Sequence, residues 1–272
     1  MLNLALSLLV CAAPPEDDPA AELRAAVERL ERAAGYAFEM HSEYHGGLGG
    51  VGTGRIGRPR AAVLGEVGVG RPVRLRFEGI ELFRTTPERR AVRTDGGEWR
   101  TADRSPPARL RGPLSMLETL RTPDEVLRCA VDGAREVSSS GGAAGSHRTW
   151  RIELSPEATR QLAGALARER RGSSLRAGAP PPEFEGKVVA VVRNGKVEEL
   201  EVEIRVRHAS PVGDRFQRRA VTYLLKPPAD PMPPVPDEVV ALLGAPPAAD
   251  GEDSTPEEKP AKAGRERKES GR

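Results

Sequence analysis

The carboxylate and imidazole side chains between residues 39 and 45 have types and spacing that could do chemistry. Glu39, His41, Glu43 and His45 alternate along the chain and would share one face of a strand. Two histidines four residues apart lie about 13 Å from each other on a regular strand, too far to share one metal ion. A neighbouring His-Glu pair with a ligand from elsewhere is the alternative, but a polar outer face is the simpler interpretation. We therefore assign no metal site and no cofactor.

The remaining candidates for catalysis lack the usual sequence context. His147 lies in a Gly/Ser-rich segment and His208 follows a charged run, and no Ser stands in a G-x-S-x-G elbow. Cys129, within Val-Leu-Arg-Cys-Ala, is typical of a small buried hydrophobic residue rather than a reactive thiol. We assign no catalytic residue and predict that the chain is not an enzyme.

A glycine run imitates a dinucleotide-binding motif. Residues 47–52 match G-x-G-x-x-G, but that motif needs a helix N-terminus directly behind its glycines to meet the phosphates. Gly54, Gly57 and Pro59 oppose a helix there. We interpret residues 46–54 as a mobile loop or a bulged edge strand.

Composition and charge limit the function classes. The chain has 272 residues, 42 Lys and Arg against 40 Asp and Glu, and a net charge of +2. Because the charges are spread evenly, no basic footprint for nucleic acid emerges. Aromatic residues make up only 4%, so Val, Leu and Ala must build the core. No repeat divides the sequence, which favours one domain over residues 21–244.

The N-terminus is typical of an exported protein. Met1 to Val10 contains only Asn3 and Ser7 as polar residues and leads through small residues into an acidic, Pro-rich spacer, so residues 1–12 resemble a secretory leader and 13–20 a spacer. The run is shorter than the roughly 20 residues of a membrane-spanning helix, so we predict no transmembrane span. Leu8 to Cys11 partly resembles a lipobox, which would acylate Cys11; cleavage after Ala12 or Ala13 is the alternative. We expect an extracytoplasmic protein, peripheral or lipid-anchored at most.

A β-hairpin gives the clearest structural signal in the chain. Two runs of alternating apolar and charged residues flank Asn194-Gly195, the pair preferred where both turn residues need positive φ. From Leu200 to Arg207 one face is apolar and the other ionic. This pattern predicts an antiparallel sheet with one solvated face.

Further strands and helices complete an α+β pattern. We predict helices over residues 21–34, 114–120, 123–129, 158–171 and 235–243, and strands over residues 36–45, 73–77, 80–85, 91–94, 98–100, 134–137, 149–154 and 216–225. An apolar sheet face needs a cover, which these helices supply. Residues 245–272 are charged, contain few apolar residues and are predicted to be a disordered tail.

The order of these elements resembles the LolA-like and LppX-like family of envelope lipoprotein carriers and lipid-binding lipoproteins. The likeness covers Ala21 to about Leu225, with local echoes at residues 30–38, 98–99, 114–120 and 194–197. It implies a curved antiparallel sheet, a half-barrel, covered by an N-terminal helix and crossover helices, with an apolar cavity for acyl chains. The strand residues expected to line that cavity are Tyr36, Phe38, Met40, Leu75, Phe77, Leu200, Val202, Ile204 and Val206. A plain structural core is the alternative for each of them.

Three hypotheses for function follow. The first is an extracytoplasmic, non-enzymatic carrier or sensor that binds a lipid or lipoprotein acyl chain in the half-barrel. The second is an envelope protein-protein interaction module that uses the sheet as a scaffold without a ligand. The third is an unrecognised hydrolase whose site is assembled from separated residues.

Overall fold

The computed structural model describes residues 19–48, 62–86, 89–101, 108–141, 147–163, 181–209, 214–228 and 232–244. The leader-like segment with Cys11, the spacer up to residue 18 and the charged tail 245–272 lie outside these ranges. So do residues 49–54 of the glycine run and residues 164–171 of an expected helix.

Eleven strands form one antiparallel sheet, in the spatial order β6-β5-β4-β3-β2-β1-β11-β10-β9-β8-β7. The strands are β1 (Gly35–Leu48), β2 (Val63–Gly68), β3 (Val73–Phe77), β4 (Ile80–Arg84), β5 (Arg90–Thr94), β6 (Arg100–Thr101), β7 (Ala134–Gly141), β8 (His147–Leu154), β9 (Glu183–Arg193), β10 (Lys196–His208) and β11 (Arg215–Lys226). Pairing of β1 with β11 joins an N-terminal meander to a C-terminal one.

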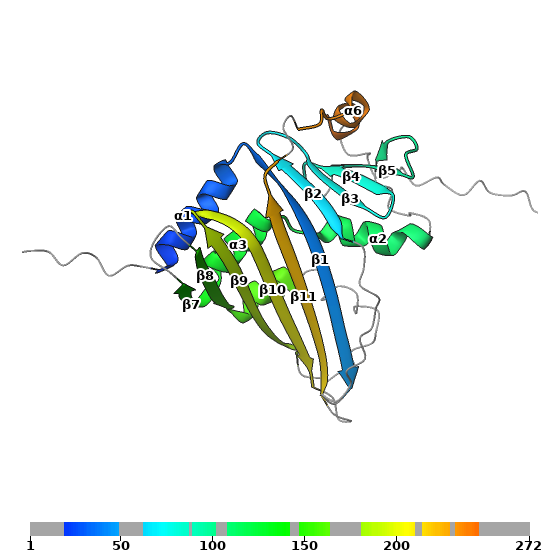
Figure 1. The fold of residues 1–272 in the computed structure, drawn as a ribbon. Helices are drawn as coiled ribbons and strands as arrows, with labels where there is room; N and C mark the ends of the chain where they lie inside the picture. Colours follow the sequence, from blue (N-terminus) through cyan, green and yellow to red (C-terminus); the bar gives the residue numbers. More distant parts are fainter. Residues whose placement is uncertain are drawn as a thin grey trace, which may run out of the picture.

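The sheet is curved and open (Figure 1). β6 and β7 lie at its two edges and do not pair with each other, so it does not close into a barrel. The prediction of an α+β fold built on a curved antiparallel sheet is confirmed.

Helices cover the concave face of the sheet. They are α1 (Pro19–Arg32), α2 (Ala108–Thr119), α3 (Pro123–Asp132) and α4 (Pro156–Ala163). α1 contacts α3 and β10, α2 contacts β3, and α4 contacts β8, β9 and β10. Apolar residues of all four helices join those of the sheet in one buried cluster. The N-terminal helix and the helices between β6 and β9 therefore form the predicted cover.

A fifth helix lies on the opposite face. In α6 (Asp237–Gly244), Val239 and Leu243 pack against Phe83 and Ala91, whose strand neighbours Leu82 and Val92 belong to the main core. Since successive strand residues point to opposite faces, α6 covers the convex face beside β4 and β5. Figure 1 shows it separated from the other helices.

The predicted hairpin is present over β9 and β10. Asn194 and Gly195 both have positive φ, 51° and 71°, as the two-residue turn requires. The register shifts by a bulge between Val197 and Glu199, and this bulge brings both Val197 and Leu200 onto the buried face.

Several element boundaries differ from the sequence-based expectation. β2 was not predicted, because Val63-Leu64-Gly65-Glu66-Val67-Gly68 has two glycines and weak alternation. β1 continues through Gly46 and Gly47 to Leu48, so the glycine run begins inside a strand. α2 begins at Ala108 with Pro113 inside it, not after Pro113. The strand expected at residues 98–100 is reduced to Arg100–Thr101.

Candidate functional site

The nine residues expected to line a cavity all lie in one buried cluster on the concave face. They come from β1, β3 and β10, and none is more than 6% exposed. They are Tyr36, Phe38, Met40, Leu75, Phe77, Leu200, Val202, Ile204 and Val206. The sheet therefore presents an apolar face that continues across both meanders.

Other strands contribute residues to the same face that were not among the nine. β11 adds Val221 and Tyr223, β9 adds Val188 and Ala190, and β2 adds Val63. The signal for the first four was period-two alternation along their strands.

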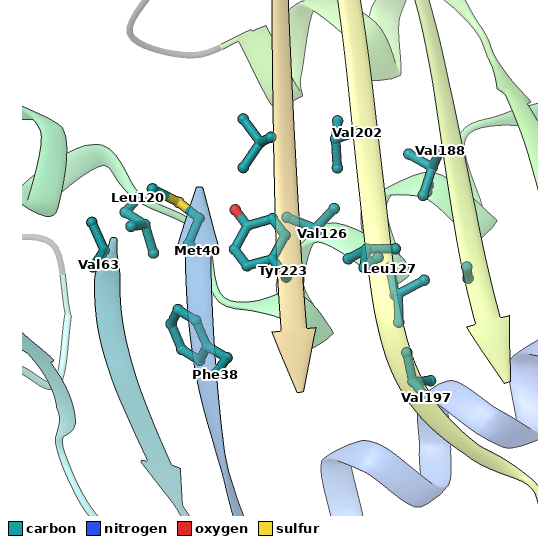
Figure 2. Close-up of a cluster of buried hydrophobic side chains, with 14 of the residues drawn as sticks. Phe38, Met40, Val63, Leu120, Val126, Leu127, Val188, Val197, Val202 and Tyr223 are labelled. Carbon is teal, nitrogen blue, oxygen red and sulfur yellow. The ribbon is translucent and has the colours of Figure 1, made fainter. Parts of the chain in front are cut away.

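The part of this face nearest the start of β1 is filled by protein. Leu120, which follows α2, and Val126 and Leu127 of α3 lie in the same cluster as Phe38 and Tyr223 (Figure 2). The Phe38 and Tyr223 rings meet edge to face, with centroids 5.8 Å apart. We call this helix-packed part the proximal half of the concave face.

Hydrogen bonds fasten the α2–α3 connection to the proximal half. The Tyr36 hydroxyl donates to the Asp124 carboxylate, and the Tyr223 hydroxyl donates to the carbonyl oxygen of Arg121 over 3.1 Å. Burial, together with the Asp124 charge, raises the pKa of Tyr36 far above its ordinary value. Burial raises the pKa of Tyr223 to about 12. Both phenols are therefore protonated donors at neutral pH.

Local sequence and a buried arginine set the geometry of this connection. Thr122 precedes α3, Pro123 begins it, and the Thr122 amide donates to Glu125 Oε2 over 2.8 Å, as in a capping box. Arg84 donates to the carbonyl oxygen of Glu118 over 3.2 Å and lies 3.5 Å from the Glu125 carboxylate. Through these contacts, the polar groups of Arg84, Thr122 and Glu125 hold the α2–α3 connection in place.

The long strands continue beyond the level of α2 and α3 (Figure 1). We call the concave face of Ser42–Leu48, Glu203–His208 and Arg215–Ala220 the distal half. Ile204 and Val206 lie on this half and are 3% and 5% exposed. Beside them, α4 approaches β9 closely at Gly186, where an added Cβ would lie 2.7 Å from Thr159 Oγ1.

The distal half also carries polar side chains. Arg219 Nε donates to Ser42 Oγ over 3.3 Å, and Gln217 is only 8% exposed. Sequence reasoning missed this group because the two strands that bring Ser42 and Arg219 together are far apart in the chain.

The convex face is covered with ion pairs. Glu203 is 3% exposed and lies 2.8 Å from Arg205, 2.8 Å from Arg218 and 3.0 Å from Lys187. Burial alone would raise its pKa, but hydrogen bonds from Arg218, Lys187 and Arg205 outweigh it and lower the pKa of Glu203 to about 2.

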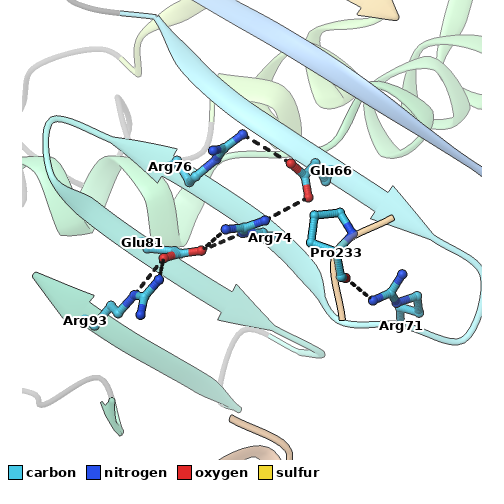
Figure 3. Close-up of polar contacts among 7 residues, drawn as sticks. All are labelled: Glu66, Arg71, Arg74, Arg76, Glu81, Arg93 and Pro233. Atoms are coloured by element: carbon cyan, nitrogen blue, oxygen red, sulfur yellow. Dashed lines mark hydrogen bonds and ion pairs between the residues drawn. The ribbon is translucent and has the colours of Figure 1, made fainter. Parts of the chain in front are cut away.

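A second group of ion pairs links the neighbouring strands β2, β3, β4 and β5. Glu66 pairs with Arg74 and Arg76, and Glu81 pairs with Arg74 and Arg93 (Figure 3). Cross-strand pairs of opposite charge stabilise neighbouring strands, so these carboxylates act as structural partners of the arginines.

His41 and Cys129 each contact a polar side chain. His41 Nε2 lies 2.9 Å from Glu39 Oε1, and Glu39 also pairs with Lys226. Hydrogen bonds from Lys226 and His41 lower the pKa of Glu39, which disfavours a role as a general acid. Burial raises the pKa of the Cys129 thiol, whose Sγ donates to Gln161. Among the described residues, no three His, Cys, Asp or Glu side chains are grouped for a metal ion.

Comparisons with known proteins assign no family. No protein-family model matches the chain, and no curated protein matches it significantly. Within the described ranges, no helix has the length and apolar character needed to cross a membrane.

Proposed function

We propose that the chain is a non-enzymatic carrier or sensor that binds a lipid or lipoprotein acyl chain on the concave face of its open sheet. The observation that supports the proposal is the buried apolar face across β1, β3, β10 and β11, which continues on β10 through Ile204 and Val206. An apolar sheet face of this extent can exclude water from a hydrocarbon chain.

The distal half is the part of the face that suits a ligand best. The proximal half is packed by side chains of α2 and α3, and its tyrosines are tied to the connection between them. Ile204 and Val206 are 3% and 5% exposed, so an acyl chain that reaches them must displace the side chains that cover them, but it leaves the contacts of Tyr36 and Tyr223 intact. The proximal members of the nine then act as core that supports the distal half.

Desolvation gives a sufficient driving force. Each buried methylene contributes about 0.8 kcal/mol, so ten contribute about 8 kcal/mol before the costs of association. Binding of this kind needs no catalytic residue. It is compatible with export by the leader-like segment and with a lipid anchor at Cys11, both of which belong to the proposal.

The first experiment asks whether the protein carries a ligand. The full chain, expressed with its N-terminal segment in a bacterial host, is analysed by native mass spectrometry and by organic extraction. A stoichiometric acylated molecule supports the proposal, and a mature chain beginning at acylated Cys11 adds the anchor. A protein that co-purifies with no ligand and also fails to bind cis-parinaric acid and its methyl ester overturns the proposal and favours the interaction module.

A pair of variants locates the binding face. Val206→Ser places a hydroxyl on the distal half, whereas Val189→Ser makes the same change on the opposite face, at a half-buried position across from Glu201. We expect Val206→Ser to weaken binding of cis-parinaric acid methyl ester at least severalfold and Val189→Ser to leave it unchanged. Equal affinities in both variants would show that the ligand does not bind on this face.

A further inference from the structure

The outer edge of β7 is open to pairing with another strand. β7 is the last strand on its side of the sheet (Figure 1), and in the described part of the chain only β8 pairs with it. Six of its eight residues are exposed, so the edge is accessible. The strand at the other edge, β6, has only two residues. Because an edge strand presents unpaired backbone N–H and C=O groups, β7 is the edge at which a further strand can add.

β7 lacks most of the features that block edge pairing. Natural sheets protect their edges with proline, lysine, bulges or very short strands. β7 has a bulge between Ala134 and Glu136, at its start. Beyond it, residues 137–141 read Val-Ser-Ser-Ser-Gly and contain neither a charge nor a proline. This part of the edge therefore accepts a strand without a steric or electrostatic obstacle.

Two acids lie side by side on the convex face at this edge. Glu136 of β7 is directly opposite Glu153 of β8. Lys187 of β9 is opposite Glu153, but its ammonium group lies 3.0 Å from Glu203. Within the described ranges, neither Glu136 nor Glu153 forms an ion pair. Since like charges directly opposite each other destabilise a strand pair, a cation supplied from beyond the edge would stabilise this one.

A second copy of the chain supplies that cation when the two β7 strands pair about Val137. In an antiparallel pair centred there, Glu136 lies opposite the partner's Ser138. Ser138 is in turn opposite Arg151 in the β7–β8 register. The partner's Arg151 is then two strands, about 10 Å, from Glu136, a gap that the long glutamate and arginine side chains span together above the small serine. Two-fold symmetry repeats this contact in the opposite direction.

The same register suits the concave face. Val137 is opposite the fully buried Ile152 and is itself partly buried against the main core. Pairing about Val137 places it against the partner's Val137, which removes apolar surface of both from water. Ser139, the next residue on this face, is exposed, so the helices leave the edge uncovered there. Both faces of the edge therefore match a second copy of themselves.

We propose that the chain forms a two-fold symmetric dimer in which β7 pairs antiparallel with β7 of a second copy, centred on Val137. The two sheets become one continuous sheet with the concave faces on the same side. Because each copy uses the same edge, the assembly closes as a dimer. The dimer requires no ligand, so it goes beyond the acyl-chain proposal and does not depend on it.

Charge reversal tests the predicted contact. Glu136→Arg and Arg151→Glu each place like charges across the dimer axis, at exposed positions on the convex face. Analytical ultracentrifugation of the full chain, between about 1 and 100 μM, measures association. We expect the wild-type chain to dimerise in this range and each variant to associate at least about tenfold more weakly. Circular dichroism checks that both variants are folded.

Mixing the two variants identifies the partner and the register. In a mixed dimer the reversed charges face each other in both symmetry-related contacts, so opposite charges are restored. We therefore expect an equimolar mixture of Glu136→Arg and Arg151→Glu to associate about as tightly as the wild-type chain, although neither variant does so alone. A defect in folding would not be repaired by mixing.

Glu185→Arg is the matched control. Glu185 is exposed on the convex face of β9, two strands inward from β7, and the change in charge is the same as in Glu136→Arg. We expect this variant to dimerise like the wild-type chain. Hydrogen exchange adds a local measurement: amides within residues 136–140 should exchange more slowly in the wild-type dimer than in Glu136→Arg.

Three results would overturn the proposal. A wild-type chain that stays monomeric at about 100 μM excludes the dimer and leaves the edge to a strand of a different protein. A dimer that both charge reversals leave intact uses another surface. A mixture of the two variants that stays monomeric shows that Glu136 and Arg151 do not meet across the axis.

Discussion

The aromatic ring of Phe38 lies over Gly65, its partner across β1 and β2, so closely that a Cβ on Gly65 would be 2.0 Å from the ring's Cζ. Phe38 is 2% exposed and its ring also contacts Tyr36 and Tyr223, with centroids 6.3 and 5.8 Å away. The glycine thus provides the space in which the Phe38 ring packs.

Gly65→Ala should therefore destabilise the fold. The added methyl forces the ring out of a close-packed position, at a cost of about 1–3 kcal/mol. We expect a lower urea midpoint by circular dichroism. Gly112→Ala is the control: it lies in α2 with open space around its Cα, and alanine there should raise stability because glycine disfavours helix. A midpoint unchanged by Gly65→Ala would contradict this packing.

The buried carboxylate of Glu203 makes stability depend on acid pH. Its pKa is lowered to about 2, so the folded state favours the ionised form. Stability from this group is complete above the unfolded-state pKa, about 4.5, and is lost as the pH falls towards about 2. The difference corresponds to about 3 kcal/mol.

Glu203→Gln should accordingly cost stability near neutral pH but much less in acid. Urea denaturation of both proteins across this range measures the difference at each pH. Glu201→Gln, an earlier residue on the same strand face, should change the neutral midpoint little. A constant difference between Glu203→Gln and wild type at every pH would show that the ion pairs are not its cause.

The two buried tyrosines should make the fold sensitive to alkali. Because their pKa values are raised, the folded state retains both protons, and stability present below about pH 10 is lost as the pH rises further. We expect near-ultraviolet absorbance to show that these phenols ionise only as the protein unfolds. Normal titration of all three tyrosines of the chain in the folded state would contradict their burial.

Removing the Tyr36 hydroxyl tests the tie between β1 and α3. Tyr36→Phe leaves the ring in place but deprives the Asp124 carboxylate of its donor, which should cost about 2 kcal/mol in a urea titration. The double variant Tyr36→Phe, Asp124→Asn should lose little more than the single one if the two groups act as a pair. Additive losses would show that they act independently.

Sequence patterns predicted those parts of the sheet in which local chemistry is decisive. The alternation of Leu200, Val202, Ile204 and Val206 and the Asn194-Gly195 turn specify β10 and its hairpin without reference to the rest of the chain. β2 depends instead on a tertiary contact: Gly65 looks like a strand breaker until the Phe38 ring is placed above it. Strand propensity alone does not reveal that the Phe38 ring packs in the space left by Gly65.

The polar group of the distal half shows a similar limit. Counting in steps of two back from Tyr223 reaches Arg219 and Gln217, so their shared face could have been predicted. Their proximity to Ser42 could not, because it depends on the register between β1 and β11, the strands that join the two meanders. Pairing between distant segments is set by the whole sheet rather than by local sequence.

The convex-face helix α6 offers a final test with a closely matched control. Val239 is fully buried against the Phe83 and Ala91 cluster, whereas the adjacent Val240 is 57% exposed. Val239→Ala should reduce stability by about 1–2 kcal/mol through the lost methyl groups and the space they leave, and Val240→Ala should be nearly neutral. Trp99 is partly buried in the same cluster, 5.3 Å from the Phe83 ring, so its fluorescence should shift only in Val239→Ala. Equal urea midpoints and equal spectra for the two variants would mean that α6 does not cover this face in solution.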